Sequence, residues 1–122
     1  MLFDTTFFID LERELASGKP GPAARYLKGA RGVAKAVSMV TIGEFAVGAC
    51  VTETRRMFRG FQAVALGRDT AVFAGRLQSK LPVMLGENDL WIAATALRFG
   101  LPLVSNDVRT FPRIPNLKLV TC

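Results

Sequence analysis

Short apolar segments alternate along this chain with longer segments in which apolar residues recur every three or four positions. The short segments predict β-strands, whereas the periodic segments predict amphipathic helices. Because the two kinds of element alternate, the pattern predicts an α/β fold with a parallel sheet that helices cover on both faces. The predicted strands cover residues 1–4, 37–40, 61–64, 101–104 and 117–120, and the predicted helices cover residues 5–16, 22–28, 42–50, 69–80 and 88–99.

Signals at the ends of two predicted helices refine this pattern. Thr41 and Glu44 have the spacing of a capping box, which predicts a helix start at Thr41. That helix would place Phe45 and Cys50 on one apolar face, so we interpret Cys50 as a buried thiol. We interpret Cys122 as a free thiol, because two isolated cysteines in a protein of this kind favour neither a disulfide nor a zinc site.

Composition narrows the chemistry. The chain of 122 residues fits one domain, residues 1–122, and carries a formal charge of +6, which favours a polyanionic partner without establishing one. It contains no histidine, which excludes Ser–His and Cys–His catalysis and histidine-ligated metal sites. Asp4 interrupts the place where a signal peptide needs a basic and then an apolar run, and no apolar stretch is long enough for a bilayer. We therefore expect a cytoplasmic protein with no membrane partner.

Four of the ten acidic residues occupy positions at which a parallel sheet binds ligands. Asp4 ends the first predicted strand, Glu44 begins the helix after the second, and Asp107 follows the fourth. Ligands bind outside the carboxyl ends of parallel strands, so these three side chains should share one edge. Asp89 begins the helix before the fourth strand and joins them only if its first turn lies over that edge, which the pattern leaves open.

Each of these carboxylates also has a purely structural explanation. Asp4 can cap the following helix, Glu44 can close the capping box, Asp89 can complement a helix dipole and Asp107 can form a turn. Caps and turns do not require four acids to gather at one edge, and gathered carboxylates repel unless a cation compensates them. Oxygen ligands favour Mg²⁺ or Mn²⁺, and such ions activate water for phosphodiester hydrolysis. Asp10 can approach the same site from its helix.

Four segments around these acids resemble the motifs of PIN-domain ribonucleases, and within that group those of VapC-type toxins from bacterial toxin–antitoxin pairs. The likeness extends over essentially the whole chain, and its third and fourth segments are the most specific. The segments are residues 3–10 (FDTTFFID), 40–48 (VTIGEFAVG), 86–96 (GENDLWIAATA) and 101–107 (LPLVSND).

The resemblance implies a three-layer α/β/α sandwich with a central, mainly parallel, five-stranded sheet. It also implies a Mg²⁺- or Mn²⁺-dependent endoribonuclease that cuts an RNA such as tRNA or rRNA and leaves a 5′-phosphate and a 3′-hydroxyl. The implied partners are a cognate antitoxin protein, which inserts a segment into the acidic groove, and a second copy of the chain in a homodimer. The implied catalytic and metal-binding residues are Asp4, Glu44, Asp89 and Asp107, and Thr5 and Asn106 would support them near the metal or phosphate.

The chain departs from the resemblance at Thr6, where many members have Asn. A threonine can hydrogen-bond but lacks the amide geometry, so the role of Thr6 in the site stays open. Two surfaces also have two interpretations each. A basic group can grip RNA or form a solvated helix face, and an apolar group can line a dimer or antitoxin surface or pack in the core. The basic group is Arg25, Lys28, Arg31 and Lys35, and the apolar group is Phe45, Met57, Phe58 and Phe61.

Two other functions compete with a nuclease. A PIN fold with weak or lost catalysis could serve as a module that binds RNA or a partner protein, although all four expected acids are present. A phosphatase of the haloacid-dehalogenase type or a receiver domain would also place aspartates at strand ends. The phosphatase requires a second Asp two residues after the first, where this chain has Thr6, and we find no suitably placed phospho-acceptor for a receiver.

Overall fold

The structure, a computed structural model, describes residues 1–122 and contains a five-stranded sheet in which every pair of neighbouring strands is parallel. The strand order β3-β2-β1-β4-β5 places β1 in the centre, between β2 and β4. This confirms the expected α/β fold with a five-stranded sheet, although the strands are shorter than predicted. Their bounds are β1 (Leu2–Phe3), β2 (Ala36–Ser38), β3 (Gln62–Val64), β4 (Leu103–Val104) and β5 (Leu119–Val120).

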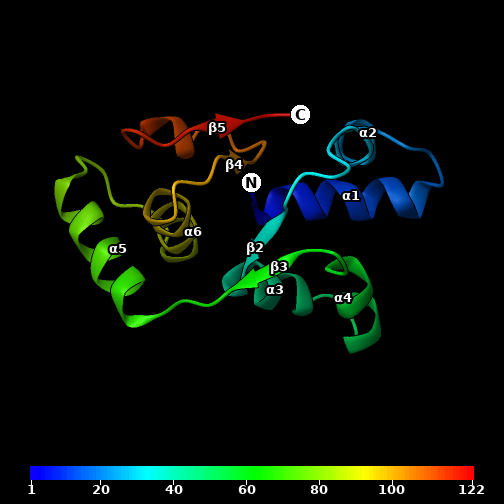
Figure 1. The fold of residues 1–122 in the computed structure, drawn as a ribbon, viewed down its shortest axis with the longest axis horizontal. Helices are drawn as coiled ribbons and strands as arrows, with labels where there is room; N and C mark the ends of the chain where they lie inside the picture. The colour runs from blue at the N-terminus through cyan, green and yellow to red at the C-terminus, as the bar shows by residue number, and fades with distance from the viewer.

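Helices pack on both sides of this sheet. Figure 1 shows α5 and α6 at one end of the view and α1 and α2 at the other, with the strands between them. None of the helices combines the length and the hydropathy that a bilayer span requires. The helices are α1 (Thr5–Ser17), α2 (Pro22–Gly29), α3 (Met39–Ala46), α4 (Val51–Met57), α5 (Arg68–Lys80) and α6 (Glu87–Arg98), followed by the short 3₁₀ helix η1 (Phe111–Arg113).

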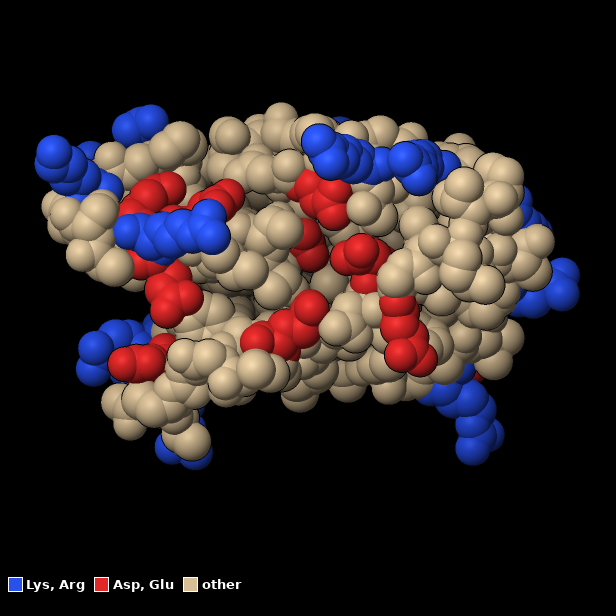
Figure 2. Space-filling view, turned by 180° about the vertical axis from the view of Figure 1, so that it is seen from behind, with Lys and Arg blue, Asp and Glu red and all other residues tan.

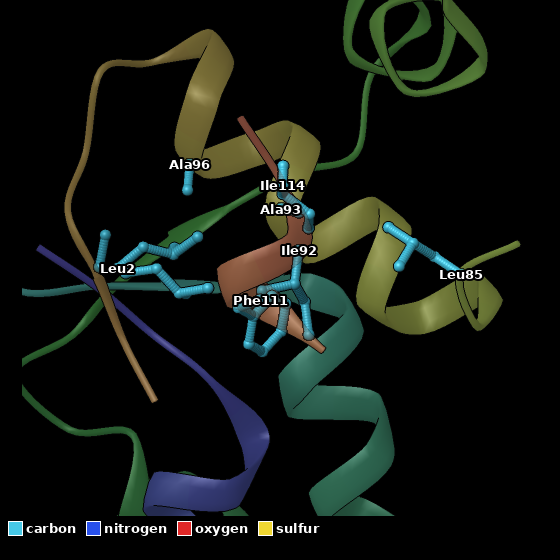
Figure 3. Packing of buried hydrophobic residues seen from close by; sticks show 9 residues of the cluster. Leu2, Leu85, Ile92, Ala93, Ala96, Phe111 and Ile114 are labelled. Atoms are coloured by element: carbon cyan, nitrogen blue, oxygen red, sulfur yellow. The ribbon is translucent and has the colours of Figure 1, made fainter. Parts of the chain in front are cut away.

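Alternating side chains of the central strands divide the core into two layers. Leu2 of β1 lies in register with Ala36 of β2 and Leu103 of β4, and all three pack in a cluster with α6 and η1. Figure 3 shows this cluster, in which Ile92 and Phe111 lie close together. The next residue of each strand faces the other way, because successive strand side chains point to opposite sides of a sheet. This alternation explains why both faces need helices.

The second layer is aromatic. Phe3 of β1 stacks edge-on against Phe7 of α1, with ring centroids 4.8 Å apart, and Phe8 stacks against Phe58 at 4.7 Å. Phe45 and Phe58 are buried in this cluster, and Met57 and Phe61 pack against it. Core packing is therefore the correct interpretation of the apolar group, rather than an open docking surface.

The start of α3 differs from the prediction. The helix begins at Met39, not at Thr41, and Ser38 is its N-cap, with its Oγ accepting a hydrogen bond of 3.1 Å from the backbone N–H of Val40. The predicted strand over residues 37–40 is therefore cut short at Ser38. The predicted capping box between Thr41 and Glu44 is wrong, because a real N-cap three residues earlier places both side chains inside the helix.

The predicted environment of Cys50 is also wrong. The structure exposes Cys50, because α3 ends at Ala46 instead of continuing to residue 50. Cys50 forms the N-cap of α4: its Sγ accepts from the backbone N–H of Glu53 at 3.4 Å, and a Glu53 carboxylate oxygen accepts from the Cys50 N–H at 3.3 Å. Cys122 is an exposed free thiol, as expected.

The carboxylate of Glu14 joins α1 to α2. Its two oxygens accept backbone N–H bonds from Gly21 (2.6 Å), Ala23 (2.9 Å) and Ala24 (2.9 Å), which are among the N–H groups that a helix start leaves without partners. A Cβ at residue 21 would lie 2.6 Å from the Glu14 Cδ, so any other residue there would displace the Glu14 carboxylate from these N–H groups. Desolvation opposes ionisation, but these N–H donors and Arg25 lower the pKa of Glu14.

We expect Glu14→Ala to lower the free energy of unfolding by about 1–2 kcal/mol, the scale of a lost helix cap. The matched control is Glu12→Ala on the same helix, because Glu12 is exposed and its side chain makes no hydrogen bond or ion pair. Urea unfolding at pH 7 measures both changes. Because the pKa of Glu14 is lowered, its contribution should be complete above pH 4.5 and fade as the pH falls through the lowered pKa. Equal effects of the two substitutions would contradict a cap role for Glu14.

Candidate metal-binding active site

The carboxyl ends of the three central strands bring the candidate acids to one edge of the sheet. Asp4 directly follows β1, and residues 105–107 follow β4, which pairs with β1. Glu44 lies on α3, which follows β2 on the other side of β1, and Asp89 lies in the first turn of α6. Figure 2 shows acidic side chains from the left side to the middle of one hollowed face, with Lys and Arg mostly towards its outline.

Asp4 is the most buried of these acids, with 2% of its surface exposed. Its Oδ2 accepts hydrogen bonds from the Ser105 hydroxyl at 2.8 Å and from the Thr6 hydroxyl at 3.0 Å. Burial raises the pKa of Asp4 above 3.8, although the bonds from Ser105, Thr5 and Thr6 act in the opposite direction. Asp4 is the N-cap residue of α1 by position, but its side chain makes no cap bond of the kind Ser38 makes.

Thr6 therefore has a definite place in this chain. Its hydroxyl lies 3.2 Å from the Ser105 hydroxyl as well as within bonding distance of Asp4. Ser105 in turn accepts the backbone N–H of Asp107 at 3.0 Å. The hydroxyl groups of Thr6 and Ser105 and the carboxylate of Asp4 thus connect the ends of β1 and β4. A threonine at position 6 provides the hydroxyl group that this contact needs.

Glu44 is held from two sides by neutral donors. The Thr5 hydroxyl donates to its Oε1 at 2.6 Å and lies 3.2 Å from the Thr41 hydroxyl. The Asn88 amide donates to its Oε2 at 3.0 Å. Thr5 thus contacts one of the predicted acids directly. Neutral donors orient the carboxylate without cancelling its charge.

Asp89 carries the clearest electrostatic sign that the acids lie together. Its pKa is raised to about 6, first by burial and then by the negative charges of Asp4, Asp107 and Glu44. The sequence left open whether Asp89 joins the other three acids, and the structure shows that it does. The first turn of α6 lies over the edge of the sheet, within electrostatic range of the other three acids.

Asp107 has a local structural role as well. Its Oδ1 accepts the backbone N–H groups of Arg109 at 3.2 Å and Thr110 at 3.0 Å, which is the turn expected for an aspartate after a strand. Both bonds use the same oxygen atom. Because the turn uses only one carboxylate oxygen, the Asp107 side chain can form the turn and also lie near Asp89.

Asn106 and Asp10 form the margin of the site. The Asn106 amide donates to the Asp10 Oδ2 at 3.0 Å, and its Oδ1 accepts the backbone N–H of Cys122 at 3.2 Å. Asp10 also pairs with Arg13 at 3.9 Å. Asn106 thus connects the β4 loop to α1 and to residue 122, while Asp10 approaches the edge from its helix.

The four acids do not form a closed coordination shell. No group of three acidic or cysteine side chains in the chain is placed closely enough to hold one ion. The arrangement is four oxygen-donor side chains in electrostatic contact, two of them fixed by hydroxyl and amide donors. Such a set suits a divalent cation better than it suits any charge pair within the protein.

Sequence reasoning missed Ser105 and Asn88. Each directly neighbours a predicted site residue, since Ser105 precedes Asn106 and Asn88 precedes Asp89. A serine at the end of a strand and an amide in a first helical turn are common, so the residue types alone gave no signal. Their partners, Asp4 and Glu44, are distant in the chain.

The four residues of the basic group, which could bind RNA or form a solvated helix face, do not share one environment. Arg25, Lys28 and Arg31 are exposed, as a binding surface or a solvated face requires. Lys35 directly precedes β2, so it lies at the edge opposite the acids, and its ammonium donates to the carbonyl oxygens of Ala30 at 3.3 Å and Val33 at 3.1 Å. Lys35 therefore has a local structural role.

Comparison with known proteins agrees with this fold. The PIN domain family model matches residues 1–117. VapBC2 from Rickettsia felis bound to a promoter DNA fragment contains a chain with a TM-score of 0.81 and 20% identity, with 99% of this chain and 97% of that chain covered. VapBC-1 from nontypeable Haemophilus influenzae gives a TM-score of 0.80 at 20% identity, with 98% and 96% covered.

A toxin–antitoxin complex from Klebsiella pneumoniae contains a chain that is 27% identical to this one, with a TM-score of 0.75 and with 98% of this chain and 95% of that chain covered. No curated protein gives a match. The family match covers nearly all of the sequence, and the fold likeness extends over both chains in full. This chain belongs to the PIN domain family.

Proposed function

We propose that this protein is a Mg²⁺- or Mn²⁺-dependent endoribonuclease and the toxin of a type II toxin–antitoxin system. The observation that carries the proposal is the position of Asp4, Glu44, Asp89 and Asp107 at one edge of the sheet, close enough for burial and the other three charges to raise the pKa of Asp89. Four carboxylates held this close repel one another, and a divalent cation is the simplest compensation. The cost of assembling them is difficult to explain for a protein without a cation to bind.

The donor chemistry of these residues fits such a cation, and their side chains would draw closer together around it, since no three of them lie close enough in this structure to hold one ion. Asp4, Glu44, Asp89 and Asp107 would supply oxygen ligands, as Mg²⁺ and Mn²⁺ prefer. When bound, the ion would lower the pKa of a water molecule and neutralise charge on the phosphodiester. The chain's own part is to orient ligands: Ser105 and Thr6 hold Asp4, and Thr5 holds Glu44.

An RNA substrate fits the charges around the site. Acidic side chains run from the left side to the middle of the face in Figure 2, Lys and Arg lie mostly towards its outline, and the formal charge of the chain is +6. Cationic side chains supply the sequence-independent part of nucleic-acid binding, because they neutralise phosphates. Arg25, Lys28 and Arg31 are exposed, so phosphates of a bound RNA can reach them, and we leave Lys35 out because of its local carbonyl bonds.

The likeness to a chain of a toxin–antitoxin complex supports an antitoxin as the natural partner. We propose an antitoxin segment that reaches the acidic face, for which an arginine side chain would be the complementary group. We further propose a homodimer that acts in the cytoplasm on tRNA or rRNA. The neighbouring reading frame checks the partner: it should encode a small protein with a DNA-binding N-terminus and an arginine-bearing tail.

We expect the purified protein to cleave RNA with Mn²⁺ or Mg²⁺ and to stop when EDTA is added. Asp89→Asn should lower the cleavage rate at least about a hundredfold, since each lost 1.36 kcal/mol of transition-state stabilisation costs tenfold. Glu87→Gln is the matched control, because Glu87 is an exposed acid in the same helical turn. Labelled RNA on a denaturing gel measures the rates.

Cleavage that persists in EDTA or in Asp89→Asn would contradict the metal mechanism. A protein that binds RNA or its partner without cleaving, in any of these conditions, would instead be a catalytically inactive PIN module.

We also expect the metal-free protein to become more stable as the pH falls from 7 to 5. The pKa of Asp89 is about 6 in the folded chain and 3.8 in the reference state, so the folded state binds the proton more tightly. The stability gained by protonation is present below 3.8 and is lost as the pH rises through about 6. No histidine titrates in this interval, so the dependence comes from carboxylates whose pKa is raised, which are Asp89 and Asp4.

Thermal unfolding in EDTA measures this pH dependence. The melting temperature should rise by a few degrees on acidification, and Asp89→Asn should remove much of that rise, whereas Glu87→Gln should keep it. At pH 7, Mn²⁺ should raise the melting temperature more than it does at pH 5, because protons compete with the metal. An identical pH dependence in the wild-type protein and in Asp89→Asn would contradict the raised pKa.

A further inference from the structure

A single amide side chain links α6 to α3 beside the acidic site. Asn88 is exposed and directly precedes Asp89 in the first turn of α6. Its Nδ2 donates to the Oε2 of Glu44 at 3.0 Å, across 44 positions of the chain. Asn88 is not one of the acids to which we assign metal binding, so this contact requires an explanation of its own.

The contact completes the hold on the Glu44 carboxylate. The Thr5 hydroxyl already engages Oε1 at 2.6 Å, and Asn88 engages the other oxygen. The two donors come from different elements, one from the start of α1 and one from the start of α6. A glutamate side chain has several rotatable bonds, and a donor at each oxygen fixes the plane of its carboxylate as well as its position.

The chemistry of asparagine suits this task better than that of other side chains. A lysine or arginine at position 88 would pair with Glu44 and neutralise the charge that attracts a cation. An aspartate would add another repelling carboxylate next to Asp89, and an apolar residue would provide no donor. A neutral amide orients Glu44 and leaves its negative charge available.

The helix geometry also explains why Asn88 and Asp89 act together. Neighbouring residues of an α-helix point about 100° apart, since there are 3.6 residues in each turn. One turn can therefore direct Asn88 towards α3 and Asp89 towards Asp4 and Asp107. A small rotation of α6 would move the Asp89 carboxylate and the donor to Glu44 at the same time.

We propose that Asn88 is a positioning residue whose amide orients the Glu44 carboxylate for the cation that Asp89 also binds. The inference rests on the proposed metal-dependent function, and it adds a residue that acts through Glu44 without touching the metal. Positioning residues of this kind typically change metal affinity or activity by about 10- to 100-fold when they are replaced.

A double-mutant cycle without metal tests the contact itself. Urea unfolding in EDTA compares the wild-type chain with Asn88→Ala, Glu44→Ala and the double variant. We expect Asn88→Ala to lower the urea midpoint when Glu44 is present and to have no further effect when Glu44 is absent. The same decrease in both backgrounds would show that Asn88 does not act through Glu44 and would overturn the proposal.

Mn²⁺ titration then tests the positioning role. Asn88→Ala should raise the Mn²⁺ dissociation constant about tenfold. Gln62→Ala is the matched control, since it removes an exposed amide on β3 that makes no side-chain hydrogen bond. The control should leave Mn²⁺ affinity unchanged.

The outcomes separate the inference from the proposed function. If Glu44→Ala and Asp89→Asn weaken Mn²⁺ binding while Asn88→Ala does not, the proposal for Asn88 fails and the metal site stands. If the wild-type protein binds no Mn²⁺, the proposed metal-dependent function fails and the positioning role fails with it. Coupling in the cycle together with weaker Mn²⁺ binding in Asn88→Ala supports both.

Discussion

The Asp4 carboxylate is almost completely removed from solvent at the end of the central strand, and neither ion pair of the chain includes it. A buried carboxylate without a cationic partner is costly unless hydrogen bonds compensate it. Here the compensation comes from the hydroxyl groups of Ser105 and Thr6. The remaining deficit is visible in the raised pKa of Asp4. The site is therefore built around a charge that the protein alone does not neutralise.

The two-sided core explains why this charge lies where it does. Leu2 and Phe3 face opposite layers of helices, and each is matched in register by residues of β2 and β4. Such a strand has no polar face along its length, so its first polar side chain emerges at its carboxyl end. The same holds for β4 and residues 105–107. Packing of the sheet thus gathers the acids, and α6 adds Asp89 from the side.

Those parts of the fold and site that follow from local periodicity could be predicted from the sequence. Asp4 and Asp107 follow apolar strands, and parallel register then places them on one edge. Glu44 was expected at the right edge for a wrong reason, because Ser38 and not Thr41 starts α3. Cys50 was misplaced by the same error in the length of that helix. Asn88 and Ser105 could not be identified, since their contacts join side chains 44 and 101 positions apart and depend on tertiary packing.

The central claim is that Asp4, Glu44, Asp89 and Asp107 form a single site for a divalent cation. Anomalous diffraction from crystals of the protein grown with Mn²⁺ tests it most directly, because Mn²⁺ is located without reference to activity. The account predicts an anomalous peak at coordination distance, about 2.0–2.2 Å, from the carboxylate oxygens of Asp4 and at least two of the other three acids. A protein with these four side chains ordered and no peak between them, in crystals grown with excess Mn²⁺, would contradict it.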